Sequence, residues 1–109
     1  LAQKWPGALT VIVPLKFPFS EKNATVAFRC PGDLWLRNVI AECGFPIYST
    51  SVNRSGSPVL DSVCKIEKEF SNEVDLIVDD GDKKGSLPST IVLLKNGGWK
   101  VLRQGSVIV

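Results

Sequence analysis

The apolar residues of the chain fall into short runs whose spacing alternates between that of strands and that of helices. Residues 9–15 are almost all apolar and rich in β-formers, which is typical of a strand covered on both faces. Residues 25–29 alternate in polarity and predict a second strand that ends in Arg29. Further strands are predicted at residues 46–48, 74–78, 90–94, 99–102 and after Gly105. The two strands at 90–94 and 99–102 form a predicted hairpin, because Lys-Asn-Gly-Gly separates them.

Two segments have helical spacing instead. Asp33 can cap a helix that runs to about Cys43, and Gly44 stands where a left-handed C-cap residue belongs. Asp61 can cap a second helix, in which apolar residues recur at helical spacing as far as Phe70. Strands that alternate with two helices predict an α/β fold with a mixed sheet. At 109 residues the chain suffices for one small domain with one core, so residues 1–109 are predicted to belong to a single domain.

Composition narrows the class of protein. Hydrophobic residues make up 44% and charged residues 22%, the balance of a folded chain, and no apolar run is long enough to cross a membrane. The net charge of +2 is too weak to indicate an extended face that follows nucleic-acid phosphates. The chain has three cysteines and no CxxC pair, which indicates buried thiols in a reducing compartment and predicts a cytoplasmic protein.

The chain contains no histidine, which excludes Ser-His-Asp and Cys-His nucleophiles, histidine general bases and histidine metal ligands. The acidic turn at residues 79–82 lacks the regular ligand spacing of a calcium loop. We therefore predict neither a catalytic nucleophile nor a protein metal site. Any chemistry must rest on carboxylates, lysine, arginine, hydroxyls, backbone amides or a bound metal.

The loop Ser51-Val52-Asn53-Arg54-Ser55-Gly56 concentrates hydroxyls, an amide and a guanidinium next to a flexible glycine. Such a loop can offer donors to phosphate or carboxylate oxygens, and we expect it to help hold a nucleotide-like anion. Composition alone favours the alternative of a solvated turn whose side chains bond their own backbone.

Polar groups also stand at the ends of the predicted strands. Thr10 follows a Pro-Gly turn, and Arg29 closes an apolar strand, where a buried cation needs either a protein carboxylate or an anionic ligand. Ser89, Thr90 and Arg103 each lie at a strand edge as well. Each of these signals is weak when taken singly.

Taken in order, five segments resemble the YrdC family of threonylcarbamoyl-AMP synthases over essentially the whole chain. The Ser-x-Asn-Arg-Ser-Gly loop is the most specific of them. The segments are Trp5-Pro6-Gly7-Ala8-Leu9-Thr10, Val26-Ala27-Phe28-Arg29-Cys30-Pro31, Ser49-Thr50-Ser51-Val52-Asn53-Arg54-Ser55-Gly56, Pro88-Ser89-Thr90-Ile91-Val92 and Arg103-Gln104-Gly105-Ser106-Val107.

The resemblance implies a twisted open α/β sheet around a wide cavity lined with basic residues. It implies that ATP, L-threonine and bicarbonate give threonylcarbamoyl-AMP and pyrophosphate, with Mg²⁺ assisting. A tRNA-modification transferase partner would then move the threonylcarbamoyl group to an adenosine of tRNA. The fold is also associated with binding of double-stranded RNA.

Positions carried over from the family give the candidate binding residues. Thr10 would touch the nucleotide or carbamate, and Arg29 would face the phosphate or the threonine carboxylate. Arg103 would approach the nucleotide. The full set of nucleotide- or threonylcarbamoyl-binding candidates is Thr10, Arg29, Ser51, Asn53, Ser55, Ser89, Thr90 and Arg103. Adenylate formation needs neutralised charge and aligned reactants more than a covalent nucleophile, so the absence of histidine does not oppose it.

The chain departs from the family pattern in four places. The family's N-terminal section with a Lys-x-Arg motif is not seen, so we expect residues 1–109 to be the C-terminal part of a YrdC-like domain and to be inactive alone. Val52 replaces the usual alanine and Gln104 a common proline, and both are tolerable. Pro14 interrupts what is often a continuous strand.

Two alternatives differ in class. One is a non-catalytic module of the same fold that binds double-stranded RNA or tRNA, which the weak net charge disfavours. The other is the related domain of hydrogenase-maturation carbamoyltransferases, which occurs in much longer chains with zinc-finger-like cysteines; no CxxC is seen here.

Overall fold

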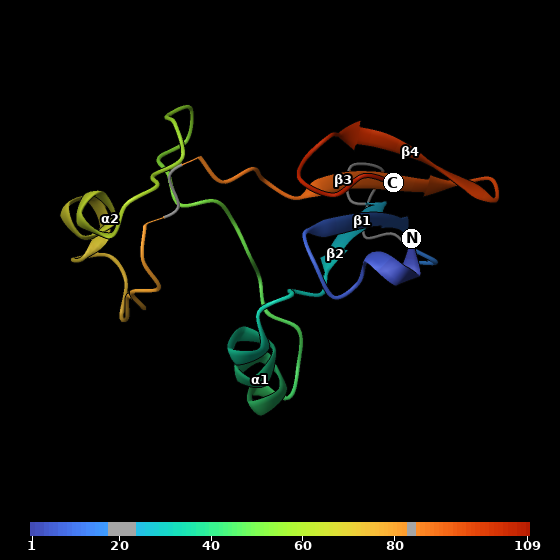
Figure 1. Cartoon of the computed structure of the whole chain (residues 1–109). Coiled ribbons are helices and arrows are strands. Elements are labelled where there is room, and N and C mark those ends of the chain that lie inside the picture. The colour runs from blue at the N-terminus through green and yellow to red at the C-terminus, as the bar shows by residue number, and fades with distance from the viewer. Residues whose placement is uncertain (18–23, 83–84) are drawn as a thin grey trace. The chain divides into compact units, whose positions relative to one another are not determined.

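The computed structural model of the chain describes residues 1–17, 24–82 and 85–109, and it divides them into two compact units (Figure 1). The first unit comprises Leu1–Pro46 and Leu87–Val109, and the second comprises Ile47–Ser86. The first unit holds the 3-10 helix η1 (Ala2–Lys4), the strands β1 (Leu9–Pro14), β2 (Thr25–Arg29), β3 (Thr90–Lys95) and β4 (Gly98–Arg103), and the helix α1 (Leu34–Cys43). The second unit holds the helix α2 (Val63–Phe70).

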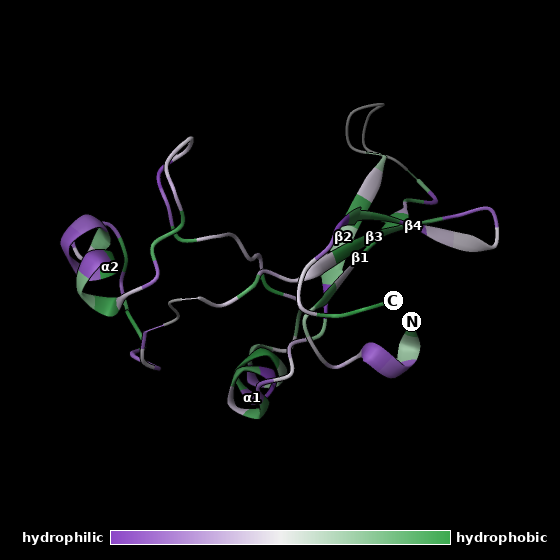
Figure 2. Cartoon of the chain, turned by 45° about the horizontal axis from the view of Figure 1, so that its top comes forward, coloured by the Kyte–Doolittle hydropathy of each residue, from purple (hydrophilic) through white to green (hydrophobic). Residues whose placement is uncertain are grey.

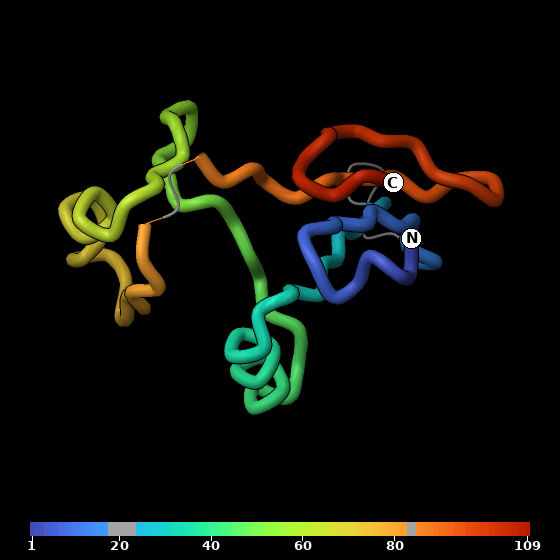
Figure 3. The backbone as a smooth tube through the Cα atoms, in the orientation of Figure 1, coloured from blue at the N-terminus to red at the C-terminus, as the bar shows by residue number. Residues whose placement is uncertain are grey.

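The four strands form one mixed sheet in the order β2-β1-β3-β4. β1 pairs antiparallel with β2 and parallel with β3, and β3 pairs antiparallel with β4. The trace in Figure 3 shows how strands from opposite ends of the chain lie side by side, with β1 in blue next to β3 in orange. The mixed sheet and the two helices confirm the predicted α/β fold class.

The core of the first unit lies on one face of the two central strands. Leu9, Val11 and Val92 are buried, and the apolar central strands stand out in Figure 2. Five partly buried residues pack against this cluster: Leu1, Trp5, Val13, Leu94 and Val109. Trp5 also donates a hydrogen bond from its indole nitrogen to the carbonyl oxygen of Leu9, at 2.7 Å, which ties the segment before β1 to the core. Full burial of a Val or Leu side chain contributes about 1.5–3 kcal/mol to the free energy of folding. The three buried residues therefore contribute only a modest part of what a stable domain needs.

Both helices begin and end where side chains satisfy their backbone groups. Asp33 accepts a hydrogen bond from the amide of Leu36 at 2.9 Å, and Gly44 has a φ of 76°, so both predicted caps of α1 are confirmed. The predicted cap of α2 is wrong by one residue. Ser62, not Asp61, accepts from the amide of Lys65 at 3.3 Å, because the hydroxyl lies next to the first helical residue. Asp61 forms an ion pair with the Lys65 side chain instead, at 3.2 Å.

Three of the predicted strands are absent from the described part of the chain. Residues 46–48, residues 74–78 and the segment after Gly105 have no strand hydrogen bonding there. Leu76, in the segment predicted to be a buried strand, is 78% exposed. These segments have the β-propensity of strands, but a strand also needs a neighbour to pair with, and sequence spacing does not reveal one.

The state of the cysteines and the length of the helices can be compared with the sequence predictions. Cys30, Cys43 and Cys64 are all free thiols, although only Cys30 is even partly buried, which corrects the expectation of buried thiols. Neither α1 nor α2, the α-helices of the described residues, has the length and hydropathy that crossing a membrane requires.

Candidate anion-binding site

Residues from all four strands form one row across an end of the sheet. Arg29 on β2 pairs with Thr10 on β1, Thr10 pairs with Ile91 on β3, and Ile91 pairs with Arg103 on β4. Residues directly opposite one another on paired strands present their side chains to the same face. The row therefore places a hydroxyl between two guanidinium groups on the face opposite the Leu9 core.

Hydrogen bonds join Thr10 and Arg103 of this row to Ser89, which precedes β3. We call these three residues the Thr10–Ser89–Arg103 cluster. The hydroxyls of Thr10 and Ser89 lie 2.8 Å apart, although their residues are 79 positions apart in sequence. Arg103 donates from Nη2 to the Ser89 hydroxyl at 3.1 Å and from Nε and Nη2 to the Ser89 carbonyl at 3.0 and 2.8 Å. The guanidinium is thus fixed in orientation by the backbone just before β3.

Arg29 is held by the turn that precedes β1. Its Nε donates to the carbonyl oxygen of Gly7 at 3.3 Å, and the Gly7 amide donates to the Cys30 carbonyl at 2.8 Å. A side chain at position 7 would bring a Cβ within 2.7 Å of the Lys4 carbonyl oxygen, so this turn requires glycine. Within the described residues neither Arg29 nor Arg103 forms an ion pair with a carboxylate. Two exposed cations without protein counter-charges can attract an anion.

The side chain of Thr90 lies on the opposite face of the sheet from the row of Arg29, Thr10 and Arg103. Its neighbour Ile91 lies in the row, so Thr90 faces the core, where it is completely buried. The hydroxyl donates to the Val107 carbonyl at 2.6 Å and accepts from the amides of Gly105 and Val107 at 3.0 and 3.2 Å. The structure thus uses the Thr90 hydroxyl to fasten the segment after β4, and a ligand contact by this side chain stays a prediction.

The polar loop in the second unit is bonded largely to itself. The Ser51 hydroxyl donates to Asn53 Oδ1, and Asn53 Nδ2 donates to the carbonyls of Arg54 and Ser57, both at 3.0 Å. Gly56 has a φ of 81°, which only glycine adopts without strain. Among the described residues the Ser55 hydroxyl has no hydrogen-bond partner. The loop therefore has the geometry of a turn that bonds its own backbone, and its binding of an anion stays a prediction.

Arg54 is the residue whose role the sequence did not indicate. Its guanidinium contacts α2 and the turn after it through Glu69 and Glu73, with nitrogen–oxygen distances of 2.7 and 2.8 Å. The hydrogen bond to Glu69, followed by that to Glu73, raises the pKa of Arg54 above its already high ordinary value. The two acidic residues lie four positions apart near the end of the predicted helix, and this local excess of negative charge could have suggested a basic partner.

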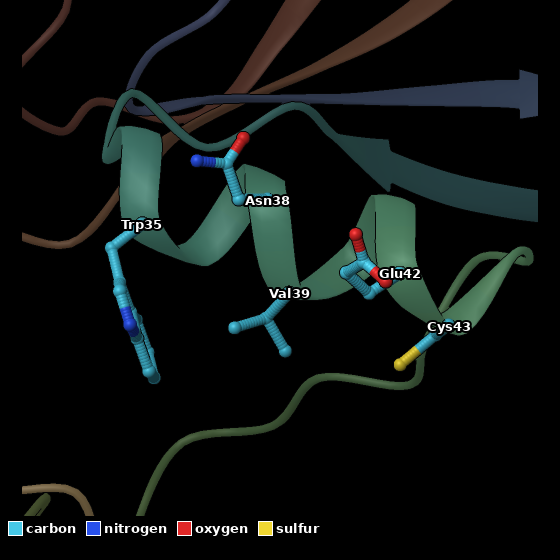
Figure 4. A pocket seen from close by; sticks show the side chains of 5 residues that line it. All are labelled: Trp35, Asn38, Val39, Glu42 and Cys43. Atoms are coloured by element: carbon cyan, nitrogen blue, oxygen red, sulfur yellow. The ribbon is translucent and has the colours of Figure 1, made fainter.

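The described part of the chain also has a surface hollow that does not resemble a site for a charged ligand. A hollow of about 370 Å³ on α1 is lined by Trp35, Asn38, Val39, Glu42 and Cys43. Figure 4 shows the side chains of Trp35 and Val39 projecting from the same side of the helix, so the hollow is mostly apolar. No group of three or more His, Cys, Asp or Glu side chains in the described residues could hold a metal ion.

Within the described residues, one face of the mixed sheet carries hydroxyls and two guanidinium groups that form no ion pair with a carboxylate, an arrangement that can attract an anion. The comparison with protein families makes this specific. Residues 1–105 match the Sua5/YciO/YrdC family model, which carries the description telomere recombination, and the chain belongs to this family. The family that the five sequence segments resemble is thereby confirmed.

Curated relatives support the same family. A putative threonylcarbamoyl-AMP synthase of Methanocaldococcus jannaschii is 31% identical over 104 residues, which are 94% of this chain and 49% of the relative. The threonylcarbamoyl-AMP synthase of Bacillus subtilis is 33% identical and that of Pseudomonas entomophila 32% identical, and the chain covers 31% and 57% of their lengths. The chain thus spans between about a third and three-fifths of these relatives.

Solved structures agree on the fold. E. coli YciO matches with a TM-score of 0.78 and 28% identity, covering 96% of this chain and 53% of YciO. Pyrococcus abyssi Sua5 complexed with L-threonine matches with a TM-score of 0.75 and 28% identity, covering 95% of this chain and 32% of Sua5.

Proposed function

We propose that this chain is part of an L-threonylcarbamoyladenylate synthase, which converts ATP, L-threonine and bicarbonate into threonylcarbamoyl-AMP and pyrophosphate. The single observation that carries the proposal is the arrangement of Arg29, Thr10, Ser89 and Arg103 on one face of a sheet in a member of this family. The names of the curated relatives and the complex of P. abyssi Sua5 with L-threonine support the same substrates.

The formation of threonylcarbamoyl-AMP suits Arg29 and the residues of the Thr10–Ser89–Arg103 cluster. The amine of threonine and bicarbonate form a carbamate with loss of water. A carbamate oxygen then attacks the α-phosphorus of ATP, and pyrophosphate leaves. ATP, bicarbonate, the carbamate and the adenylate are anions, threonine carries a carboxylate, and negative charge gathers on the phosphate oxygens. Arg29 and Arg103 would neutralise that charge, while the hydroxyls of Thr10 and Ser89 would hydrogen-bond the phosphate or carboxylate oxygens.

The polar loop of the second unit supplies further candidates, Ser51, Asn53 and Ser55. Ser51 and Asn53 are hydrogen-bonded within their own loop, so binding through either side chain would require these hydrogen bonds to be exchanged. The Ser55 hydroxyl has no such bond to exchange within the described part of the chain. Such exchange is inexpensive in an exposed turn, because water can replace a lost partner.

Mg²⁺ would come with ATP rather than from a site on the protein. The described residues offer no cluster of metal ligands, and the groups at the site are hydroxyls and guanidinium groups, which are not those that Mg²⁺ prefers. Assistance by Mg²⁺ is accordingly proposed for the complete domain, of which this chain is a part.

We also propose that the product passes to a tRNA-modification transferase in the cytoplasm. Threonylcarbamoyl-AMP is a mixed anhydride of a carbamate and a phosphate, which water cleaves, so a nearby acceptor enzyme would preserve it. The three free cysteines agree with a reducing compartment.

The test compares the chain alone with a chimera. In the chimera, residues 1–105 replace the matched part of the B. subtilis threonylcarbamoyl-AMP synthase. Incubation with ATP, L-threonine and bicarbonate, with mass-spectrometric detection of threonylcarbamoyl-AMP, should give product with the chimera. The chain alone should give none, because it spans only part of its relatives.

A folded chimera that makes no product would contradict the proposed function. Product from residues 1–109 alone would overturn the proposed inactivity of this chain and leave the assignment of the reaction intact.

A further inference from the structure

Arg54 is the only cation of the polar loop, and in the structure it faces α2. Its Nε lies 2.7 Å from Glu69 Oε1, and its Nη2 lies 2.8 Å from Glu73 Oε2. The same Nη2 donates to the backbone carbonyl of Glu69 at 3.2 Å, and the guanidinium carbon lies 4.5 Å from the centre of the Phe70 ring. One side chain thus contacts the last turn of α2 and the residues just after it in four ways.

These contacts use properties that arginine has and lysine lacks. The planar guanidinium donates in two directions at once and stacks on an aromatic ring, whereas an ammonium is a single point of charge. The carbonyl of Glu69 belongs to the C-terminal turn of α2, where backbone oxygens lack helical partners and cations are favoured. Arg54 therefore completes the end of the helix while it joins the loop to it.

The backbone of Arg54 is at the centre of the loop's own hydrogen bonds. Its carbonyl accepts from Asn53 Nδ2 at 3.0 Å and from the amide of Ser57 at 2.9 Å. Asn53 in turn accepts from the Ser51 hydroxyl. Hydrogen bonds thus link the Arg54 backbone to the Asn53 side-chain amide and, through Asn53, to the Ser51 hydroxyl.

We propose that Arg54 is a positioning residue, which fixes the loop of residues 51–56 to α2 and so orients Ser51 and Asn53, and which does not contact the ligand itself. This inference rests on the proposed function in assigning Ser51 and Asn53 to the binding of the adenylate. The ordering of the loop by Arg54 does not depend on any ligand.

The first experiment measures that ordering in the isotopically labelled chain without ligand. Arg54→Ala should speed amide hydrogen exchange across residues 51–57 by about tenfold and change the Asn53 side-chain amide signals. Glu69→Ala should have the same effect in weaker form, because it removes one ion-pair partner of Arg54, keeps Glu73 and leaves the sequence of the loop unchanged. Glu67→Ala is the matched control on the same helix and should leave the loop unchanged, since Glu67 contributes no side-chain contact to Arg54.

Arg54→Lys separates charge from geometry. Lysine keeps the positive charge but cannot contact Glu69 and Glu73 through two separate nitrogens. Amide hydrogen exchange of the loop in Arg54→Lys should therefore resemble that in Arg54→Ala. Full recovery of loop order by lysine, or unchanged exchange in both Arg54→Ala and Glu69→Ala, would overturn the proposal.

The second experiment titrates the same chains with threonylcarbamoyl-AMP. Arg54→Ala and Glu69→Ala should both weaken the response of the loop. If Arg54 contacted the ligand directly, Arg54→Ala would weaken binding while Glu69→Ala, which frees the guanidinium, would leave it equal or stronger; this result would contradict the positioning role. A lack of any response in the unaltered chain would count against the proposed function alone, because the exchange measurement decides the ordering separately.

Discussion

The close approach of Gly105 to the start of β3 gives a prediction whose size follows from the structure. Gly105 is buried, and a Cβ at this position would lie 2.1 Å from the Pro88 carbonyl oxygen. It would also lie 2.6 Å from Ser89 C and Thr90 N. All three atoms belong to the backbone, so no change of rotamer can relieve the overlap.

Gly105→Ala must therefore move one backbone segment away from the other by about 1 Å to reach ordinary contact distances. Overpacking of this kind costs about 1–3 kcal/mol, and the upper end applies here because backbone must shift. A loss of about 3 kcal/mol lowers the Tm of a domain near 100 residues by roughly 12 °C or more. The shift would also disturb the hydrogen bond from the Gly105 amide to Thr90 and the alignment of Arg103 with Ser89.

Denaturant unfolding followed by tryptophan fluorescence is the appropriate assay, because Trp5, Trp35 and Trp99 all lie in the unit that contains Gly105. Gly98→Ala is the matched control, since a Cβ there meets nothing within 4 Å. Equal stabilities of the two variants would mean that the backbone contact at Gly105 does not limit the size of the residue there.

The remaining predictions concern single contacts. Thr90→Val leaves the amides of two backbone positions without their acceptor and should lower the free energy of unfolding by about 1–3 kcal/mol, whereas Thr25→Val on the exposed edge of β2 should change it little; denaturant unfolding compares them. Ser62→Ala should lower the helicity of α2 more than Asp61→Ala, with a cost near 1 kcal/mol, because Ser62 is the cap; a larger loss from Asp61→Ala in circular dichroism would contradict the assignment. Arg103→Lys in the chimera should weaken the apparent affinity for ATP by about 10- to 100-fold, since lysine cannot reproduce the two-nitrogen contact with Ser89, and unchanged kinetics would remove Arg103 from the site.

The sequence predicted best what local rules determine. The caps of α1 follow from the preferences of Asp33 and Gly44 for their positions, and the β3–β4 hairpin follows from its Asn-Gly turn. The predicted strands at residues 46–48 and 74–78 were wrong within the described chain, because pairing depends on distant segments that periodicity does not identify.

The candidate site was predictable only in part for a similar reason. Spacing suggested that Thr10, Ser89 and Arg103 stand at strand ends. Their hydrogen bonds, however, depend on the pairing of β1 with β3, a strand far along the chain. Thr10 and Ser89, whose hydroxyls meet there, are 79 positions apart in the sequence. The same pairing turns Thr90 to the core, which adjacency to Ser89 did not reveal. The sequence indicated no role of its own for Arg54 within the polar loop, and its partners are two glutamates and a phenylalanine in and just after α2.

The sharpest test of the site is a titration of the labelled chain with threonylcarbamoyl-AMP, followed residue by residue by nuclear magnetic resonance. We expect saturable shifts at Thr10, Arg29, Ser89 and Arg103 at up to millimolar ligand, because hydroxyls gather there with two guanidinium groups that form no ion pair within the described residues. Shifts confined to the apolar hollow on α1, or none at millimolar ligand, would contradict an anion site on this face of the sheet.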